Sequence, residues 1–205
     1  IRQHRQGGLK PSRTLWNKYN KPYVRDTLKE MFHDKCAYCE AKITHVAYPH
    51  IEHYRPKKKY PQYTFEWKNL LLACGICNGS AHKGDNFPLQ DGDEDNPLLL
   101  NPCEDDPAQH LQFEYARVVP LSERGRQTCK LLGLNTRDEL FDQRRGYLHH
   151  IYYIRCLVEI CERNGDQMMA QQGQTLLNRA TSVESEYTAM VRQFLASPLP
   201  QQPPL

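Results

Sequence analysis

Two pairs of cysteines in Cys-x-x-Cys spacing are the most specific chemical feature of this chain. The pairs are Cys36 with Cys39, and Cys74 with Cys77. Four thiolates in two short pairs form the ligand set of a closed tetrahedral structural zinc site. Two other interpretations remain open: buried thiols that bind no metal, and a redox motif, although redox motifs of this spacing occur singly. We predict that the four cysteines bind a structural Zn²⁺.

A Glu-His dipeptide, Glu52-His53, lies between the two cysteine pairs. A closed four-cysteine site leaves no ligand position for either residue. Phosphodiester hydrolysis needs a base that activates water and a divalent cation that stabilises charge on the phosphate and the leaving oxygen. His53 suits the first role, and the Glu52 carboxylate suits Mg²⁺ or Mn²⁺, which prefer oxygen ligands. Alternatively, His53 is an ordinary core or surface histidine.

Further polar side chains lie on both sides of the second cysteine pair. Asn78 directly follows Cys77, where its amide oxygen can be a second metal ligand, or where it can simply be a turn residue. Asn69 directly precedes an apolar run, where it can simply be a cap or turn residue. His82 and Lys83 follow within a few residues. This region therefore adds several metal donors and a cation to the Glu-His pair.

Charge is divided unevenly along the chain. Residues 1–90 contain 16 Lys and Arg against 7 Asp and Glu, a net charge of +9, whereas residues 91–205 contain 11 against 17, a net charge of −6. A basic half is typical of a polyanion-binding protein, because phosphate contacts release counterions. We expect the backbone of a nucleic acid to be contacted by a basic run, with a solvated loop as the alternative. The run consists of Arg55, Lys57, Lys58 and Lys59.

The elements that must position these residues in the basic half are short. A helix is predicted over residues 21–33, leading to the first cysteine pair. Residues 64–77 are expected to begin extended and to end in the buried run 70–73 before the second pair. The segment 91–97 has the composition of a loop and marks a boundary.

The acidic half is predicted to be mainly helical. Residues 111–120 alternate enough for a strand or hairpin. Thr136-Arg137-Asp138-Glu139 reads as a capping box, and the helix that it opens is expected to end near Arg163. Another helix is predicted over residues 183–195. Residues 197–205, with four prolines and two glutamines, read as an extended or disordered tail.

The composition also bears on compartment. No apolar run approaches the roughly 18 residues of a membrane helix. The first ten residues lack the apolar core of a signal peptide. Only four of the eight cysteines are in paired spacing, whereas an oxidised secreted scaffold is denser in cysteine and shorter. We expect a cytoplasmic protein with reduced thiols and no membrane partner.

Roughly residues 30–90 resemble the HNH endonucleases. The likeness rests on the order Cys36-x2-Cys39, Glu52-His53-Tyr-Arg-Pro56, Asn69, Cys74-x2-Cys77-Asn78 and Lys83-Gly-Asp-Asn-Phe-Pro88. The resemblance implies an α+β fold with a ββα-metal (HNH) core and a four-cysteine zinc site, followed by a mainly helical C-terminal part.

The same resemblance implies a role for each polar residue. His53 would be the general base, and Asn69 would orient it through a backbone contact across the hairpin. Glu52 and Asn78 would hold the catalytic Mg²⁺ or Mn²⁺. His82 would stand in for the third histidine of the family name as a further metal ligand, and Lys83 would contact phosphate.

The finer sequence is similar to one subfamily, the retron- and Septu-associated HNH effectors of PtuB type. The segments on which this similarity rests are His50-Ile-Glu-His-Tyr-Arg-Pro56, Cys74-Gly-Ile-Cys-Asn-Gly-Ser80 and Asn101-Pro-Cys-Glu-Asp-Asp-Pro107. The likeness implies a role in bacterial anti-phage defence beside an ABC-type ATPase called PtuA, with a retron complex as a further possibility. The acidic helical half would then be a docking or regulatory module.

We therefore predict four parts and one main function. The parts are an N-terminal arm (1–29), a zinc-stapled HNH nuclease core (30–96), a mainly helical acidic domain (97–196) and a Pro-rich flexible tail (197–205). The function is metal-dependent hydrolysis of nucleic acid, with DNA favoured and RNA possible. One alternative is a zinc-knuckle nucleic-acid-binding subunit without catalysis. Another is an interaction protein in which the acidic helices do the work and the zinc site is a staple.

Overall fold

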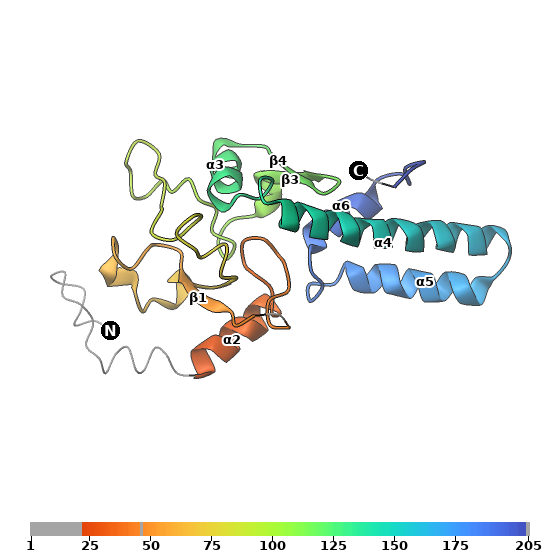
Figure 1. The fold of residues 1–205 in the computed structure, drawn as a ribbon, viewed down its shortest axis with the longest axis horizontal. Helices are drawn as coiled ribbons and strands as arrows, with labels where there is room; N and C mark the ends of the chain where they lie inside the picture. The colour runs from red at the N-terminus through yellow and green to blue at the C-terminus, as the bar shows by residue number, and fades with distance from the viewer. Residues whose placement is uncertain (1–21, 46, 204–205) are drawn as a thin grey trace.

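A globular body carries a long helical hairpin that projects from one end (Figure 1). The computed structural model describes residues 22–45 and 47–203. The helices are α2 (Pro22–Phe32), α3 (Glu123–Leu132), α4 (Asp138–Arg163), α5 (Gln167–Ala180) and α6 (Thr188–Ala196), with short 3₁₀ helices η2 (Pro61–Tyr63), η3 (Trp67–Asn69) and η4 (Pro107–Gln109). The strands are β1 (His50–His53), β2 (Leu70–Ala73), β3 (Leu111–Glu114) and β4 (Arg117–Pro120). The predicted N-terminal arm lies outside the described residues up to position 21.

The basic half is built on the antiparallel pair of β1 and β2. Every side chain of β2 is buried, and Val24 and Leu28 of α2 are buried with them in the same apolar cluster. The register pairs His53 with Leu70 and His50 with Ala73. The backbone N–H of Ala37, inside the first cysteine pair, donates to the carbonyl of Leu72 at 2.8 Å. The first cysteine loop is therefore attached directly to β2.

Two local predictions for this half need correction. The predicted segment 64–77 contains the 3₁₀ helix η3 before β2, rather than the expected extended chain. Residues 74–106 form turns and bridges with no helix, so the helix implied after the second strand of a ββα core is replaced by turns. The backbone N–H of Asn78 donates to the Cys74 carbonyl at 3.0 Å, which leaves a single closed turn there.

The acidic half contains the predicted hairpin and long helix, together with two helices that sequence analysis did not predict. The hairpin is β3–β4, and α4 ends at Arg163 as expected. The unpredicted helices are α3 and α5. The expected capping box is wrong, because the N-cap of α4 is Arg137, which makes no side-chain cap hydrogen bond. The last helix starts at Thr188, later than predicted, because the chain turns at Tyr187 with φ of 52°.

A single cluster of buried apolar side chains includes residues from both charge halves, from Val24 of α2 to Phe194 of α6. Polar contacts also join them. The Lys35 ammonium donates to the Ser185 carbonyl at 3.0 Å. The α+β class with a helical C-terminal part is confirmed, while the four domain boundaries stay a prediction. Among the described residues, no helix has the length and apolarity needed to cross a membrane.

The described part of the predicted flexible tail packs back on the body. Leu199 is partly buried against the apolar cluster. The Tyr152 hydroxyl of α4 donates to the Gln201 carbonyl at 3.4 Å. A short proline-rich segment can be held this way because one apolar side chain and one carbonyl find partners on a long helix.

Two glycines give a matched test of packing. A Cβ built at Gly125 of α3 would lie 2.1 Å from the His110 carbonyl oxygen, whereas one at Gly146 of α4 meets nothing within 4 Å. We expect Gly125→Ala to lower the free energy of unfolding by about 2 kcal/mol, because backbone must move. Gly146→Ala should raise it by about 0.5–1 kcal/mol through helix propensity. Urea unfolding measures both, and equal effects would contradict the packing of α3 on His110.

Candidate active site and metal centre

The four paired cysteines form one compact cluster. Their Sγ atoms all lie within 4.8 Å of one another, and three of the four residues are buried. A tetrahedral zinc site with Zn–S of about 2.3 Å has S–S edges of about 3.8 Å, so the cluster has the dimensions of a metal site. Among the described residues, no other group of three His, Cys, Asp or Glu side chains comes together in this way. The cluster could therefore hold a structural metal ion.

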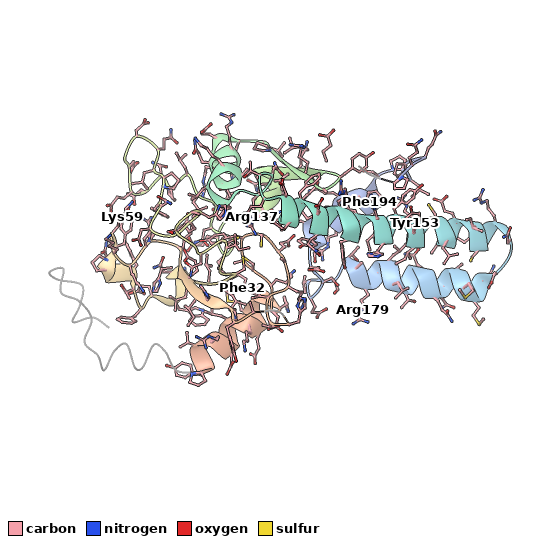
Figure 2. The ribbon with its side chains drawn as sticks, in the orientation of Figure 1. Phe32, Lys59, Arg137, Tyr153, Arg179 and Phe194 are labelled. Atoms are coloured by element: carbon pink, nitrogen blue, oxygen red, sulfur yellow. The ribbon has the colours of Figure 1, made fainter. Side chains whose placement is uncertain are left out.

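Cationic side chains from the start of the helical half surround this cluster. The Arg137 guanidinium donates to Cys77 Sγ at 3.2 Å. Figure 2 shows Arg137 at the start of α4, close to the loops of the basic half. Arg144 is buried, donates to the Leu134 carbonyl at 2.7 Å and interacts electrostatically with Cys39. Burial raises the pKa of the Cys36 thiol, whereas hydrogen bonds with the other cysteines lower the pKa of Cys74. Nearby positive charge is what a set of thiolates requires.

Glu52 of β1 is buried and forms an ion pair. Its side chain is 4 % exposed, and the Lys83 ammonium, which is 0 % exposed, lies 2.8 Å from Oε1. Burial raises the pKa of the Glu52 carboxyl, and the positive charge of Lys83 opposes that rise. The predicted contact of Lys83 with phosphate is wrong in this conformation, because its ammonium faces inward. Glu52 is therefore a buried oxygen donor with a fixed counter-charge.

His53 follows Glu52 but has a different electrostatic environment. Its Nε2 lies 3.0 Å from the Thr64 carbonyl oxygen. A carbonyl only accepts, so Nε2 carries the hydrogen and Nδ1 carries the lone pair. Burial lowers the pKa of His53 to about 4, so the imidazole is neutral at neutral pH. A neutral, oriented imidazole is the form that a general base needs.

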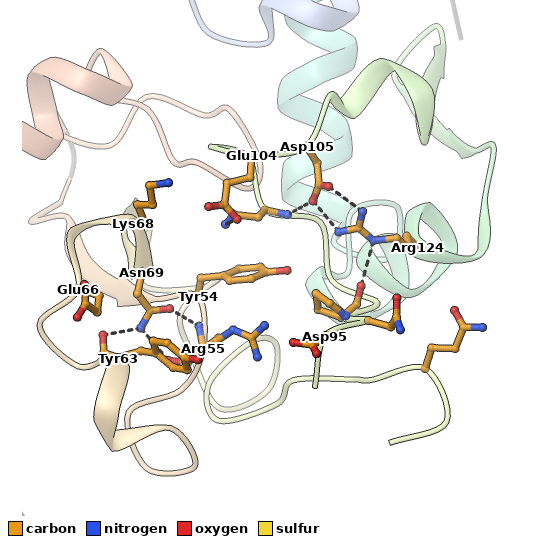
Figure 3. A pocket seen from close by; sticks show the side chains of 14 residues that line it. Tyr54, Arg55, Tyr63, Glu66, Lys68, Asn69, Asp95, Glu104, Asp105 and Arg124 are labelled. Carbon is orange, nitrogen blue, oxygen red and sulfur yellow. Dashed lines mark hydrogen bonds and ion pairs between the residues drawn. The ribbon is translucent and has the colours of Figure 1, made fainter. Parts of the chain in front are cut away.

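Asn69 holds backbone rather than the imidazole itself. Its Oδ1 accepts from the Arg55 N–H at 2.7 Å, and its Nδ2 donates to the Arg55 and Tyr63 carbonyls, both at 3.1 Å (Figure 3). Tyr63 directly precedes Thr64, whose carbonyl faces His53. The backbone carbonyl of Asn69 also accepts from the Tyr54 N–H at 2.9 Å. We infer a positioning role, because Asn69 ties both segments that flank His53.

Asn78 lies beside β1. Its amide Nδ2 is 3.1 Å from Nδ1 of His50. His50 and Glu52 are alternate residues of one strand, so their side chains leave the same face. The turn after Cys77 therefore places the Asn78 amide beside the strand face from which His50 and Glu52 both project. This arrangement supports Asn78 as a ligand candidate, and it adds His50 to the site.

His82 is directed to a different neighbour from the one predicted. A Cβ built at Gly133, which ends α3, would lie 2.8 Å from Cε1 and 3.2 Å from Nδ1 of His82. The imidazole therefore packs against the C-terminus of α3. This contact contradicts the prediction that His82 joins Glu52 and Asn78 at a metal ion.

The basic run is divided by the fold. Lys57, Lys58 and Lys59 are exposed, as a nucleic-acid contact requires, and Lys58 lies 3.9 Å from Asp85 in an exposed pair. The Arg55 guanidinium is instead half-buried and lies 5.3–5.5 Å from the centroids of Tyr60, Tyr63 and Phe87. Its cation–π contacts engage it in the fold. The prediction that Arg55 contacts nucleic acid is therefore not supported.

Arg55 and Asn69 also line a cavity of about 520 Å³ between the two halves (Figure 3). Its opposite wall contains Arg124, which forms a two-pronged ion pair with Asp105 at 2.6 and 2.7 Å. Asp105 in turn accepts from the Asn101 N–H at 2.7 Å. The cavity lies on the Asn69 side of the hairpin, and its polar groups mostly bind one another.

The profile of the HNH endonuclease family matches residues 36–84, which contain the cysteine cluster, the Glu-His pair and Lys83. Residues 36–84 are an HNH endonuclease domain. The chain is similar to HNH endonucleases of the PtuB type.

Three relatives support this assignment. The chain is 38 % identical over 152 residues to Septu protein PtuB of Bacillus mycoides (strain KBAB4), covering 62 % of the chain and 51 % of the relative. It is 32 % identical over 133 residues to Septu protein PtuB of Bacillus thuringiensis, covering 64 % and 48 %. Septu protein PtuA of Bacillus mycoides (strain KBAB4) is 27 % identical over 135 residues, covering 53 % and 18 %. The chain thus spans about half the length of the PtuB relatives that it matches.

Sequence analysis missed several contacts of the HNH domain. The Thr64 carbonyl that orients His53 is a backbone group and has no residue-type signal. Arg137 was interpreted as part of a cap. His50 had a usable signal, because its two-residue spacing from Glu52 places both on one strand face.

The cysteine cluster is tested by a matched pair of substitutions. We expect Cys39→Ser to reduce bound metal from about one ion per chain to about zero and to prevent cooperative folding, because the fold of such a site depends on its metal. Cys103 is exposed and free, so Cys103→Ser should retain the metal and the fold. Elemental analysis with thermal unfolding measures both. Equal metal content in the two variants would refute the cluster as the metal site.

Asn69 is tested by an isosteric change. In Asn69→Asp a carboxylate oxygen replaces Nδ2 and faces two carbonyls, so we expect a loss of about 2–3 kcal/mol in unfolding free energy. The same change at exposed Asn86, whose side chain donates to the His82 carbonyl, should cost less than about 1 kcal/mol. Denaturant unfolding compares the two variants. An unchanged unfolding free energy in Asn69→Asp would exclude the proposed hydrogen bonds from Asn69 to the backbone of Arg55 and Tyr63.

Proposed function

We propose that the chain is a metal-dependent endonuclease that hydrolyses phosphodiester bonds in nucleic acid, with DNA as the favoured substrate. The observation that carries this proposal is the buried neutral His53, held through Nε2 by the Thr64 carbonyl and next to the Glu52 carboxylate. Exposed Lys57, Lys58 and Lys59 follow a few residues later and supply positive charge for the polymer backbone.

In the proposed mechanism, Nδ1 of His53 takes a proton from the attacking water. Glu52 and Asn78 are the proposed ligands of Mg²⁺ or Mn²⁺, since a buried carboxylate and an amide are hard donors. When bound, the ion stabilises charge on the scissile phosphate and the leaving oxygen. A structural Zn²⁺ at the four cysteines supplies folding energy and no chemistry. Asn69 positions His53 indirectly, through its hydrogen bonds to the backbone segments on either side of that residue.

A role beside a partner is the second part of the proposal. We propose an anti-phage effector that works with a PtuA-like ABC-type ATPase, and the similarity to Septu proteins PtuB and PtuA supports this proposal. Association with a retron complex stays a prediction. The projecting part of α4 supports docking, because Tyr153, Leu157 and Ile160 are 58 %, 45 % and 46 % exposed at helical spacing. Apolar side chains in such a row are suited to a partner surface.

A non-catalytic nucleic-acid-binding subunit is the alternative, and one observation favours it. The Lys83 ammonium lies on the carboxylate proposed to bind metal. Such a protein would bind nucleic acid through its exposed lysines and cleave nothing.

Cleavage assays on plasmid DNA and total RNA, with Mn²⁺ or with EDTA, separate the two functions. We expect His53→Ala to lower the cleavage rate at least about a hundredfold, because the general base is lost. The control is His45→Ala, a change at an exposed histidine that should leave the rate unchanged. Structural metal content should be the same in both variants; loss of that metal in His53→Ala would refute the separation of roles. Binding without cleavage by the chain together with its ATPase partner would favour the alternative.

A further inference from the structure

Lys83 is bound at three points. Its ammonium lies 2.8 Å from Glu52 Oε1 and donates to the carbonyls of His53 at 3.1 Å and Gly84 at 3.2 Å. The side chain is completely buried. A buried ammonium with one ion-pair partner and two carbonyl acceptors is held in one place, because leaving any of them would cost desolvated charge.

The backbone around Lys83 is equally constrained. Its N–H donates to the Cys77 carbonyl at 3.1 Å, which ties it to the second cysteine pair. The next residue, Gly84, has φ of +39°, and a Cβ there would lie 3.0 Å from the Ser80 Cα. The Lys83 charge therefore cannot readily move away from Glu52 when another cation arrives.

A simple charge balance follows for the metal-binding face. The Glu52 carboxylate is neutralised by Lys83, and the Asn78 amide carries no charge. Asp85 is 56 % exposed and lies beside Lys58, so it is screened by solvent. Protein groups thus offer a divalent cation oxygen donors with almost no net negative charge, so the protein alone attracts the ion weakly.

We propose that Lys83 is a positioning residue that makes divalent-metal binding at Glu52 depend on bound nucleic acid. A phosphodiester supplies the negative charge that Lys83 removes, so metal and substrate bind together. This inference rests on the proposed function, because it takes Glu52 as a ligand. It also accounts for a buried lysine at a nuclease metal site, where a surface phosphate contact was expected.

Mn²⁺ binding to the full chain provides the test, in a His53→Ala background that prevents cleavage. Electron paramagnetic resonance measures free Mn²⁺ directly. We expect weak binding without nucleic acid, and about tenfold tighter binding in Lys83→Met, because removing a contacting charge strengthens the field of the carboxylate. The matched control is Lys130→Met, which removes an exposed positive charge on α3 that has no role in the proposed site; it should change the affinity less than about twofold. Equal Mn²⁺ affinity with and without the Lys83→Met change would overturn the proposal.

A second measurement does not depend on whether Lys83→Met folds. Linkage requires Mn²⁺ to tighten oligonucleotide binding by the same factor that the oligonucleotide tightens Mn²⁺ binding. Fluorescence anisotropy of a labelled oligonucleotide, with and without Mn²⁺, should show at least about a tenfold effect in the chain that retains Lys83. No effect of Mn²⁺ would overturn the proposal.

The failure of each proposal has its own signature. If Glu52→Ala leaves Mn²⁺ binding and Mn²⁺-dependent cleavage intact, Glu52 is not a ligand and the proposed mechanism fails together with the role of Lys83. If cleavage needs Mn²⁺ and Glu52 but Mn²⁺ binds equally well without nucleic acid, only the role of Lys83 fails.

Discussion

The structure depends on how charge is neutralised around four cysteine sulfurs packed within 4.8 Å of one another. The two pairs join the loop after α2 to the end of β2, so this cluster determines where the Glu52-His53 hairpin and the Asn78 turn meet. Four thiolates cannot remain together in a buried place without positive charge. A metal ion held by the four cysteines would supply it from within, and Arg137 supplies a hydrogen bond from outside. Arg137 thereby joins the helical half to the cysteine cluster of the HNH domain.

Two adjacent residues on β1, Glu52 and His53, are buried in opposite electrostatic surroundings. Glu52 is buried against the Lys83 ammonium, so its charge has a partner inside the fold. His53 is buried against a carbonyl; burial lowers its pKa, and the carbonyl selects one tautomer. The alternation of a strand allows this, because neighbouring side chains face different surroundings. A short hairpin can thus present a carboxylate and a neutral base within one dipeptide.

The net charge of each half of the chain does not predict which charged side chains lie inside the fold. The half with a net charge of −6 nevertheless contributes three arginines with partners inside the fold, Arg124, Arg137 and Arg144. Arg124 pairs with Asp105 across the cavity wall, and the other two lie near the cysteine cluster. Acidic residues on the outside of this half are consistent with a role other than binding nucleic acid. Charge counts indicated a polyanion-binding half, but they could not reveal which cations would be buried.

The sequence by itself determined the cysteine cluster, the Glu-His hairpin, the β3–β4 hairpin and the end of α4, because spacing and apolar pattern act locally. It also indicated the HNH domain through the order of its residues. Only the tertiary structure decided that Lys83 faces Glu52, that His82 packs on Gly133 and that Arg55 lies among aromatic rings. These side chains follow turns or loops, where residue type sets no direction. The partners of Lys83 and His82 are distant in sequence, so burial and long-range contacts determine which groups meet.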